Sequence, residues 1–298
     1  MNDMEREEAL SAAKEAAFDA ALGVKLLRRA ALVDEEETSL SASAELVNIL
    51  SGSGSHTHVF ATDAVKLRIR YMLQATGTHG VIWRSERVSA LACERGWGGI
   101  RVAGQNVIEL GCGTALCGLA CAALGAASVW LTDVDDGALK LAQSNVELNG
   151  LSAMTRVRRF DVMNQPPEEA AGAEAAEVEA SEAGGEAEEF MSSWPYSRRT
   201  PPRFELVLAS DIPYDFVEPA KLVEALALVL ARTPSARALV VQDLDTSRSQ
   251  AHQQGVRACV ELAARHPELR LVASEQPTEE DPCRLVHLYA AASAPAAG

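Results

Sequence analysis

The fold is decided by VIELGCGTALCGLACAALGA at residues 107–126 and SVWLTDVDD at residues 128–136. Each stretch opens with an apolar run that predicts a buried strand, and the first continues into a helix. Glycine has no Cβ, so Gly111 and Gly113 let the backbone turn tightly and approach a ligand closely. The second strand ends at Asp133, twenty positions after Gly113, where an acid can accept hydrogen bonds from ribose hydroxyls. Strand, glycine turn, helix, strand and acid together indicate half of a nucleoside-binding fold.

The glycine spacing separates this turn from two other nucleotide-binding turns. A dinucleotide fingerprint needs a third glycine three residues after the second, where this chain has Leu116. No Lys-Ser or Lys-Thr pair follows the turn, which excludes a phosphate-binding P-loop. An ordinary strand–helix turn without a ligand is the alternative.

Strand and helix patterns alternate through the rest of the chain. The expected strands are 155–160, 204–209 and 238–242, the expected helices are 138–148, 221–231 and 252–265, and 269–273 and 285–289 alternate like an antiparallel pair. Upstream, 59–73 contains strand patterns and 89–93 a helix. This order predicts an α/β, Rossmann-like fold with a mostly parallel sheet of about seven strands, helices on both faces and an antiparallel last strand.

Composition divides the chain into an extension and one domain. Residues 1–55 combine helix-forming residues with a Ser/Gly-rich linker, and residues 56–298 form the domain, with His56 and His58 expected in a solvated loop. An acidic insert at about 165–202 is rich in Glu, Ala and Gly. It has too few large apolar residues to offset the entropy of ordering, so we expect a disordered loop.

The charge and the cysteines limit the class of protein. The 298 residues carry a net charge of −15, which repels nucleic acid and favours a cationic substrate such as a lysine-bearing protein. No apolar run reaches membrane-spanning length and the first residues are acidic, so we expect a cytoplasmic protein, with the nucleus as a second compartment. No CxxC pair occurs, so we expect no metal site. We read Cys93, Cys259 and Cys283 as isolated, and the other cysteines as buried thiols in the turn and its helix.

Two motifs carry a resemblance to a known family. The pattern E-x-G-x-G-T-x-L-x-G, from Glu109 to Gly118, resembles motif I of class I S-adenosylmethionine methyltransferases. Residues 210–214, Ser-Asp-Ile-Pro-Tyr, resemble the Asp-x-x-Tyr motif of the methyltransferase-like 21 type of seven-strand protein-lysine methyltransferases. Trp83 after a glycine loop and the terminal RLVHLYAA are similar to the same family, and the resemblance covers about 59–164 and 203–292.

The resemblance implies S-adenosyl-L-methionine as cofactor and a lysine of a protein as methyl acceptor. By this resemblance Asp211 fixes the amine through a charge-assisted hydrogen bond and Tyr214 orients it. Glu109 would face the methionine end of the cofactor. Most of the expected cofactor-binding residues lie at the ends of predicted strands, where such sheets bind ligands; the full set is Trp83, Glu109, Gly111, Cys112, Gly113, Asp133, Asp161 and Ser210.

Each acid also has a plainer interpretation. Asp133 could be the N-cap of the following helix, and Asp161 could be a turn residue. The segment that contains Asp211 could be a helix-initiating turn with Tyr214 in the core.

Departures from the family pattern leave alternatives open. Ala115 replaces a family glycine and fits if its φ is negative, Glu86 replaces an alanine, and Asp161 stands where the family has a tryptophan. A catalytically inactive interaction protein is therefore one alternative. A methyltransferase that acts on histidine or on a non-protein acceptor is another, although Ser-Asp-Ile-Pro-Tyr differs from the Asn-Pro-Pro-Tyr of enzymes that methylate base amines. The sequence indicates no oligomeric state.

Overall fold

The computed structural model describes residues 56–71, 80–163, 203–212, 217–231, 233, 235–244, 250–275 and 284–293. The extension 1–55 and the acidic insert 165–202 lie outside the described residues. The strands are β1 (His56–Ala61), β2 (Lys66–Tyr71), β3 (Asn106–Leu110), β4 (Ser128–Asp133), β5 (Thr155–Arg159), β6 (Leu206–Ser210), β7 (Arg237–Asp243), β8 (Leu269–Glu275) and β9 (Arg284–Ala291). The helices are α3 (Arg84–Glu94), the short 3-10 helix η3 (Trp97–Gly99), α4 (Leu116–Ala123), α5 (Asp136–Leu148), α7 (Pro219–Ala231) and α8 (Gln250–Arg265).

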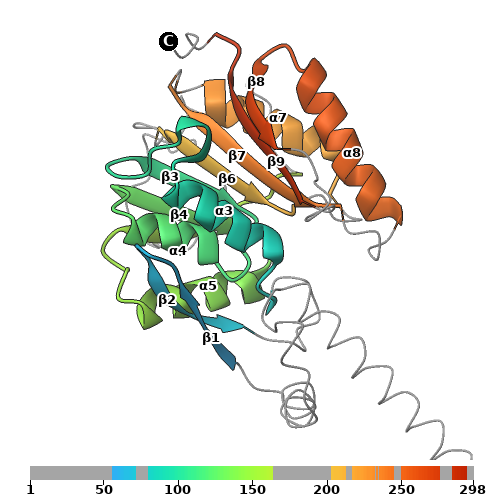
Figure 1. The fold of residues 1–298 in the computed structure, drawn as a ribbon. Coiled ribbons are helices and arrows are strands. Elements are labelled where there is room, and N and C mark those ends of the chain that lie inside the picture. Colours follow the sequence, from blue (N-terminus) through green and yellow to red (C-terminus); the bar gives the residue numbers. More distant parts are fainter. Residues whose placement is uncertain are drawn as a thin grey trace, which may run out of the picture.

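Seven strands form the main sheet in the order β5-β4-β3-β6-β7-β9-β8 (Figure 1). The strands β3 to β7 are mutually parallel, and β9 runs antiparallel to both β7 and β8. This confirms the predicted fold class. The chain leaves β3 toward β4 and β5 and then returns to the other side of β3 with β6, so the strand order reverses between β3 and β6. Ligands of open α/β sheets bind at the carboxyl ends of strands at such a switch point.

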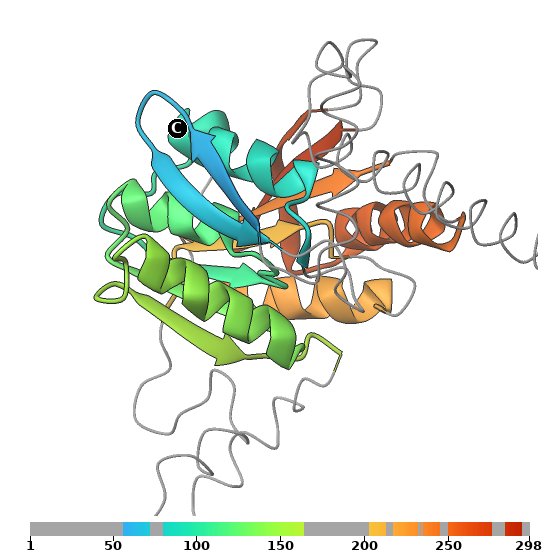
Figure 2. The same cartoon turned by 90° about the horizontal axis from the view of Figure 1, so that it is seen from below.

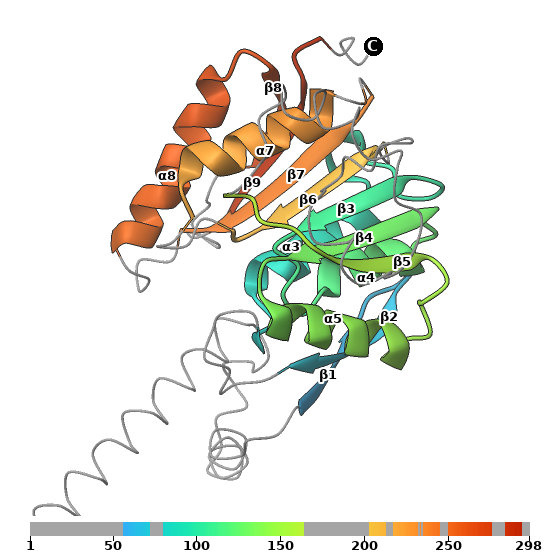
Figure 3. The same cartoon turned by 180° about the vertical axis from the view of Figure 1, so that it is seen from behind.

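Helices cover both faces of the sheet (Figures 1 and 3). One apolar core includes residues of α3, α4 and α5, and the other includes residues of α7 and α8. Neighbouring residues of β3 point to opposite cores, with Val107 in the first and Ile108 in the second. A strand buried on both faces explains its continuous apolar sequence. In the described part of the chain, no helix has both the length and the apolar character needed to cross a membrane.

The strands β1 and β2 form a separate antiparallel hairpin that packs against α5 (Figure 2). Alternate residues of β2 face inward, and Leu67, Ile69 and Tyr71 are buried. The expected solvated loop at His56 and His58 is therefore wrong, because these residues pair with β2 in the hairpin. Alternating apolar residues of the partner strand bring this polar segment into register.

Candidate functional site at the switch point

The turn after β3 forms one wall of the site. Gly111 and Gly113 have φ of +60° and +49°, a left-handed conformation that suits glycine. A Cβ at Gly111 would lie 3.3 Å from Cγ1 of Ile212, which follows β6. The turns after β3 and β6 therefore lie against each other at the reversal of strand order, and Gly111 is itself exposed.

Asp133, at the end of β4, faces the same turn. Its Oδ2 accepts a hydrogen bond from Gly113 N at 3.0 Å, and its Oδ1 accepts one from Asp135 N at 3.0 Å. Asp135 is the N-cap of α5 and accepts from Ala138 N at 2.9 Å, so the N-cap alternative for Asp133 is excluded. A carboxylate oxygen can accept more than one hydrogen bond, so Asp133 can also accept from a ligand hydroxyl.

Glu109 and Cys112 lie deeper than the glycines. Glu109 is 1% exposed and its Oε2 accepts from Gly118 N at 2.9 Å, which ties the start of α4 to β3. Burial first, and the charge of Glu86 second, raise the pKa of Glu109 well above its usual value. The Cys112 thiol is buried, burial raises its pKa, and Cys112 N donates to Thr132 O at 2.8 Å. Direct cofactor contacts by these two residues stay predictions.

Ala115 has a φ of +64°, so the turn accommodates an alanine although the condition of a negative φ is not met. The turn closes through a hydrogen bond from Ala115 N to Cys112 O at 2.6 Å, and Ala115 is the N-cap of α4. The geometry of the tight turn outweighs the steric preference of alanine. A left-handed alanine costs about 1–2 kcal/mol.

Trp83 and Glu86 come to the site from the start of α3. Trp83 is the N-cap and is 9% exposed. Glu86 is buried, and its Oε2 accepts from Thr114 Oγ1 at 2.7 Å. Burial raises the pKa of Glu86 to about 8, and the carboxylates of Asp211 and Asp133 add to the shift, while hydrogen bonds from Thr114 and the Trp83 backbone oppose it. The sequence marked Glu86 only as a departure, and the structure places it beside the glycine turn.

Asp211 follows β6 on the other wall. It is fully buried and has a φ of +58°. Asp211 N donates to Val241 O at 2.8 Å, and Asp243 N donates to Asp211 Oδ1 at 3.4 Å. His252 Nε2 lies 3.1 Å from Asp243 O and 3.7 Å from Asp211 Oδ1. Because a carbonyl can only accept, Nε2 carries the proton of this hydrogen bond. His252 was missed from the sequence, since it lies 41 positions from Asp211.

The remaining predicted residues lie at different places. Ser210 Oγ is 2.7 Å from Ser89 Oγ, which joins the end of β6 to α3. Asp161 follows the edge strand β5, and its Oδ1 accepts from Met163 N at 2.8 Å, as the turn interpretation expects. Tyr214 lies outside the described residues. The structure thus gathers the residues that follow β3, β4 and β6, and it places Asp161 after the neighbouring edge strand.

Buried carboxylates dominate the electrostatics of this site. Glu86, Glu109, Asp133 and Asp211 are each at most 9% exposed, and the charge of Glu86 is coupled to both aspartates. Uncompensated buried charge is unfavourable. The arrangement therefore favours a ligand that carries positive charge.

The cysteine prediction needs a correction. Cys93 on α3 is not isolated, because its Sγ and those of Cys117 and Cys121 on α4 all lie within 4.8 Å of one another. All three thiols are buried where the two helices pack. Two of the cysteines are four residues apart and so share one face of α4, but the contact with α3 is long-range and invisible in the sequence.

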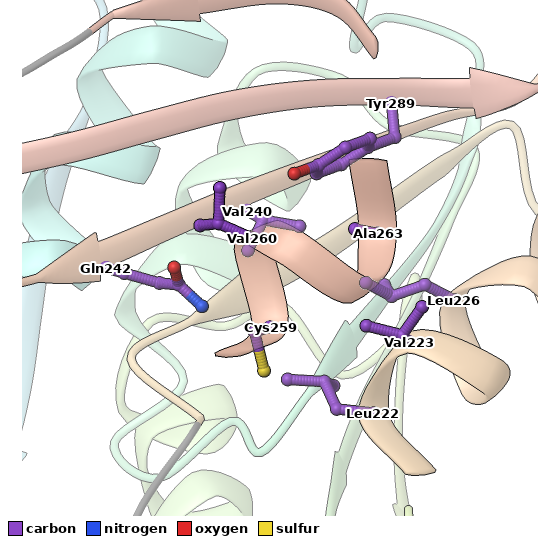
Figure 4. A pocket seen from close by; sticks show the side chains of 9 residues that line it. All are labelled: Leu222, Val223, Leu226, Val240, Gln242, Cys259, Val260, Ala263 and Tyr289. Carbon is purple, nitrogen blue, oxygen red and sulfur yellow. The ribbon is translucent and has the colours of Figure 1, made fainter. Parts of the chain in front are cut away.

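A small hollow lies away from this site, between α7, α8 and the sheet (Figure 4). Its volume is about 10 Å³, which is roughly enough for one water molecule. Apolar side chains line most of it, and the buried amide of Gln242 has no hydrogen-bond partner among the described residues. A nucleoside does not fit in so small a hollow.

Comparison with known proteins agrees with the sequence motifs. Residues 61–178 match the family model described as lysine methyltransferase. The ribosomal protein L11 methyltransferase of Syntrophomonas wolfei is 40% identical over 62 residues, 21% of this chain and 20% of that protein. That of Streptococcus pyogenes serotype M3 is 31% identical over 99 residues, 33% of this chain and 29% of that protein. The chain thus spans 20–29% of the length of these curated relatives.

A solved structure also shows a weak similarity to this chain. The O-methyltransferase from Bacillus cereus, solved in complex with S-adenosylhomocysteine, is 13% identical with a TM-score of 0.41. The superposition covers 70% of this chain and 80% of that one.

Proposed function

We propose that this protein transfers a methyl group from S-adenosylmethionine to the side-chain amine of a lysine in a protein substrate. The observation that carries the proposal is the pair of acids at the switch point. Asp133 is bonded to the glycine turn after β3, and the buried Asp211 follows β6 on the opposite side of that turn. The match of residues 61–178 to lysine methyltransferases supports the same function.

The residues of the first wall fit the cofactor. Gly111 is exposed and lets the backbone of the turn approach a ligand closely, and the carboxylate of Asp133 can accept hydrogen bonds from ribose hydroxyls. Trp83, Glu109, Cys112 and Gly113 lie around this turn, and Ser210 lies across from it. We propose all of them, together with Asp161 after β5, as cofactor-binding residues.

The chemistry leaves the protein few tasks. The bound cofactor supplies a methyl group already activated by its sulfonium. Asp211 is proposed to hold the lysine nitrogen by a charge-assisted hydrogen bond and to favour the orientation in which its lone pair faces the methyl group. Tyr214, three residues further, is proposed to orient the same nitrogen. The lysine ammonium, whose ordinary pKa is near 10.4, must first lose a proton to solvent, so that the nitrogen has a lone pair. The bond from sulfur to methyl would then break as the bond from nitrogen to methyl forms, with S-adenosylhomocysteine as the leaving product.

The charge of the chain supports a basic partner. At −15, the protein attracts lysine-rich segments and repels phosphate backbones. We therefore propose a protein substrate and not a nucleic acid. We place the reaction in the cytoplasm, with the nucleus as the second compartment to test.

Incubation of the full chain with tritiated S-adenosylmethionine and a proteome extract tests the proposal. We expect label on a lysine of a protein band, identified by mass spectrometry of the methylated peptide. Label on histidine or on a small molecule would contradict the proposal that a protein lysine is the methyl acceptor. An absence of label together with no heat on calorimetric titration of cofactor would favour the non-catalytic alternative.

A further inference from the structure

Glu86 has no part in the function as proposed so far, although it lies at the site. Its side chain is 5% exposed and bonded to the hydroxyl of Thr114 at 2.7 Å. Thr114 directly follows Gly113, which donates to Asp133. The carboxylates of Glu86 and Asp133 are therefore attached to adjacent residues of one turn.

The Glu86 carboxylate lacks a cationic partner within the described residues, where no lysine or arginine forms an ion pair with it. Its charged neighbours are the carboxylates of Asp211 and Asp133, which make ionisation harder, and the buried Glu109, whose own pKa the charge of Glu86 raises. Burying an ionised carboxylate without a counter-charge is costly. The free protein avoids this cost by keeping Glu86 protonated up to about pH 8, whereas a cationic group of a ligand would stabilise the ionised form.

The cofactor carries two positively charged groups, and only one suits Glu86. The sulfonium has no N–H to donate, whereas the ammonium of the amino-acid end has three donors. The ribose is expected at Asp133, which is hydrogen-bonded to Gly113 of the turn. Glu86, which is hydrogen-bonded to the next residue, Thr114, is then available to the amino-acid end of the cofactor.

A second observation concerns the neighbouring residue. The Ser85 side chain is 3% exposed, and its hydroxyl has no hydrogen-bond partner among the described residues. Ser85 and Glu86 belong to the first turn of α3, an eleven-residue helix. Unpaired N–H groups and the helix dipole favour a carboxylate at such a turn.

We propose that the first turn of α3 recognises the amino-acid end of the cofactor. Glu86 accepts hydrogen bonds from the ammonium group, and the Ser85 hydroxyl donates to the carboxylate. The inference rests on the proposed function, because it concerns the same cofactor. The glutamate that replaces a family alanine is then a binding residue and not damage to the cleft.

Calorimetric titration with two nucleosides tests this. S-adenosylhomocysteine has the amino-acid end, and 5′-methylthioadenosine has the same adenosine without it. We expect Glu86→Gln to weaken the binding of S-adenosylhomocysteine at least tenfold and to change the affinity for 5′-methylthioadenosine by less than about twofold. Ser85→Ala should also weaken the binding of S-adenosylhomocysteine alone. The matched control is Glu94→Gln, since that carboxylate on the same helix accepts from Thr62 Oγ1 at 2.7 Å, and we expect it to change neither affinity.

Proton release on ligand binding tests the same inference with the unmodified protein, so the test does not depend on the folding of a variant. An ammonium favours the ionised form of Glu86, so its pKa falls on binding. Because that pKa is about 8 beforehand, binding at pH 7 should release up to about one proton. Titrations in buffers of different ionisation enthalpy should show this release with S-adenosylhomocysteine and none with 5′-methylthioadenosine.

The contrary results distinguish a failure of this inference from a failure of the proposed function. Equal weakening of both ligands by Glu86→Gln, or unchanged S-adenosylhomocysteine affinity, overturns the inference alone. Absence of the differential proton release also overturns it. If the unmodified protein binds neither ligand, both the inference and the proposed function are overturned.

Discussion

Ala115 and Asp211 are the two non-glycine residues with positive φ in the described part of the chain. One follows β3 and the other follows β6, so both lie at the switch point. Such backbone conformations cost about 1–3 kcal/mol each and persist only where the surrounding structure imposes them. Their position indicates that this edge of the sheet is shaped for a site at some expense of stability.

At the residue scale, Asp211→Asn should reduce methyl transfer at least 100-fold and leave the affinity for S-adenosylhomocysteine within about threefold. The amide keeps the volume of the side chain but removes the charge that holds the amine. Transfer rates and calorimetry on the same preparation check this. Asp136→Asn, on the exposed start of α5, is the control and should change neither quantity. An equal loss of cofactor affinity would show that Asp211 serves the cofactor and not the lysine.

Asp133→Ala should weaken the binding of S-adenosylhomocysteine by about tenfold or more, because the ribose hydroxyls lose their hydrogen-bond acceptor. It also removes the acceptor of Gly113 N and Asp135 N, so some loss of stability is expected. Asp135→Ala separates the two effects. It removes the N-cap of α5, which should cost about 1 kcal/mol in unfolding while the affinity stays unchanged. Equal affinity of both variants would exclude Asp133 from the ribose site.

At the element scale, Asn145 of α5 and Asn149, the C-cap of that helix, join the hairpin to the domain. Asn145 accepts from Arg70 N at 2.7 Å and donates to Arg70 O at 3.0 Å, and Asn149 makes the corresponding pair with Arg68 at 2.8 Å each. Asn145 Nδ2 also donates to Thr114 O at 2.9 Å. One buried amide thus connects the hairpin, α5 and the glycine turn.

Asn145→Ala should lower the free energy of unfolding by about 1–3 kcal/mol, because it leaves buried backbone groups without partners. Amide hydrogen exchange in β2 should speed up in the same variant. Asn149→Ala removes similar bonds at a more exposed place and should cost less. Urea unfolding of both variants measures the difference, and the reverse order would contradict the role given to Asn145.

At the scale of the whole molecule, buried acids link stability to pH. The folded protein keeps the proton of Glu86 up to about pH 8, whereas the unfolded chain loses it near 4.5. Between these values the folded state binds more protons, so this group lowers the free energy of unfolding as pH rises. Glu86→Gln should therefore gain stability over the unmodified protein between pH 5 and 8.5, by up to about 1.4 kcal/mol per pH unit. Urea unfolding at pH 5, 7 and 8.5 checks this, and a constant difference would contradict it.

Local patterns predicted much of the fold and the position of the glycine turn and the acid after it. Strand Asn106–Leu110 and strand Ser128–Asp133 were visible as apolar runs, and their ends located Gly111, Gly113 and Asp133. Residues that act through distant partners gave no such signal. His252 was read only as part of a helix, and Glu86 only as a departure from a motif.

The sequence by itself determined the alternation of strands and helices, the glycine turn and the acids at strand ends, because these depend on periodicity and on neighbours along the chain. Only the tertiary structure decided that Ala115 is left-handed, that Cys93 meets Cys117 and Cys121, and that Glu86 lies beside the turn. Those features depend on how α3 packs against α4 and the sheet. Burial and the charge of distant residues, which set the pKa of Glu86, exist only once the chain has folded.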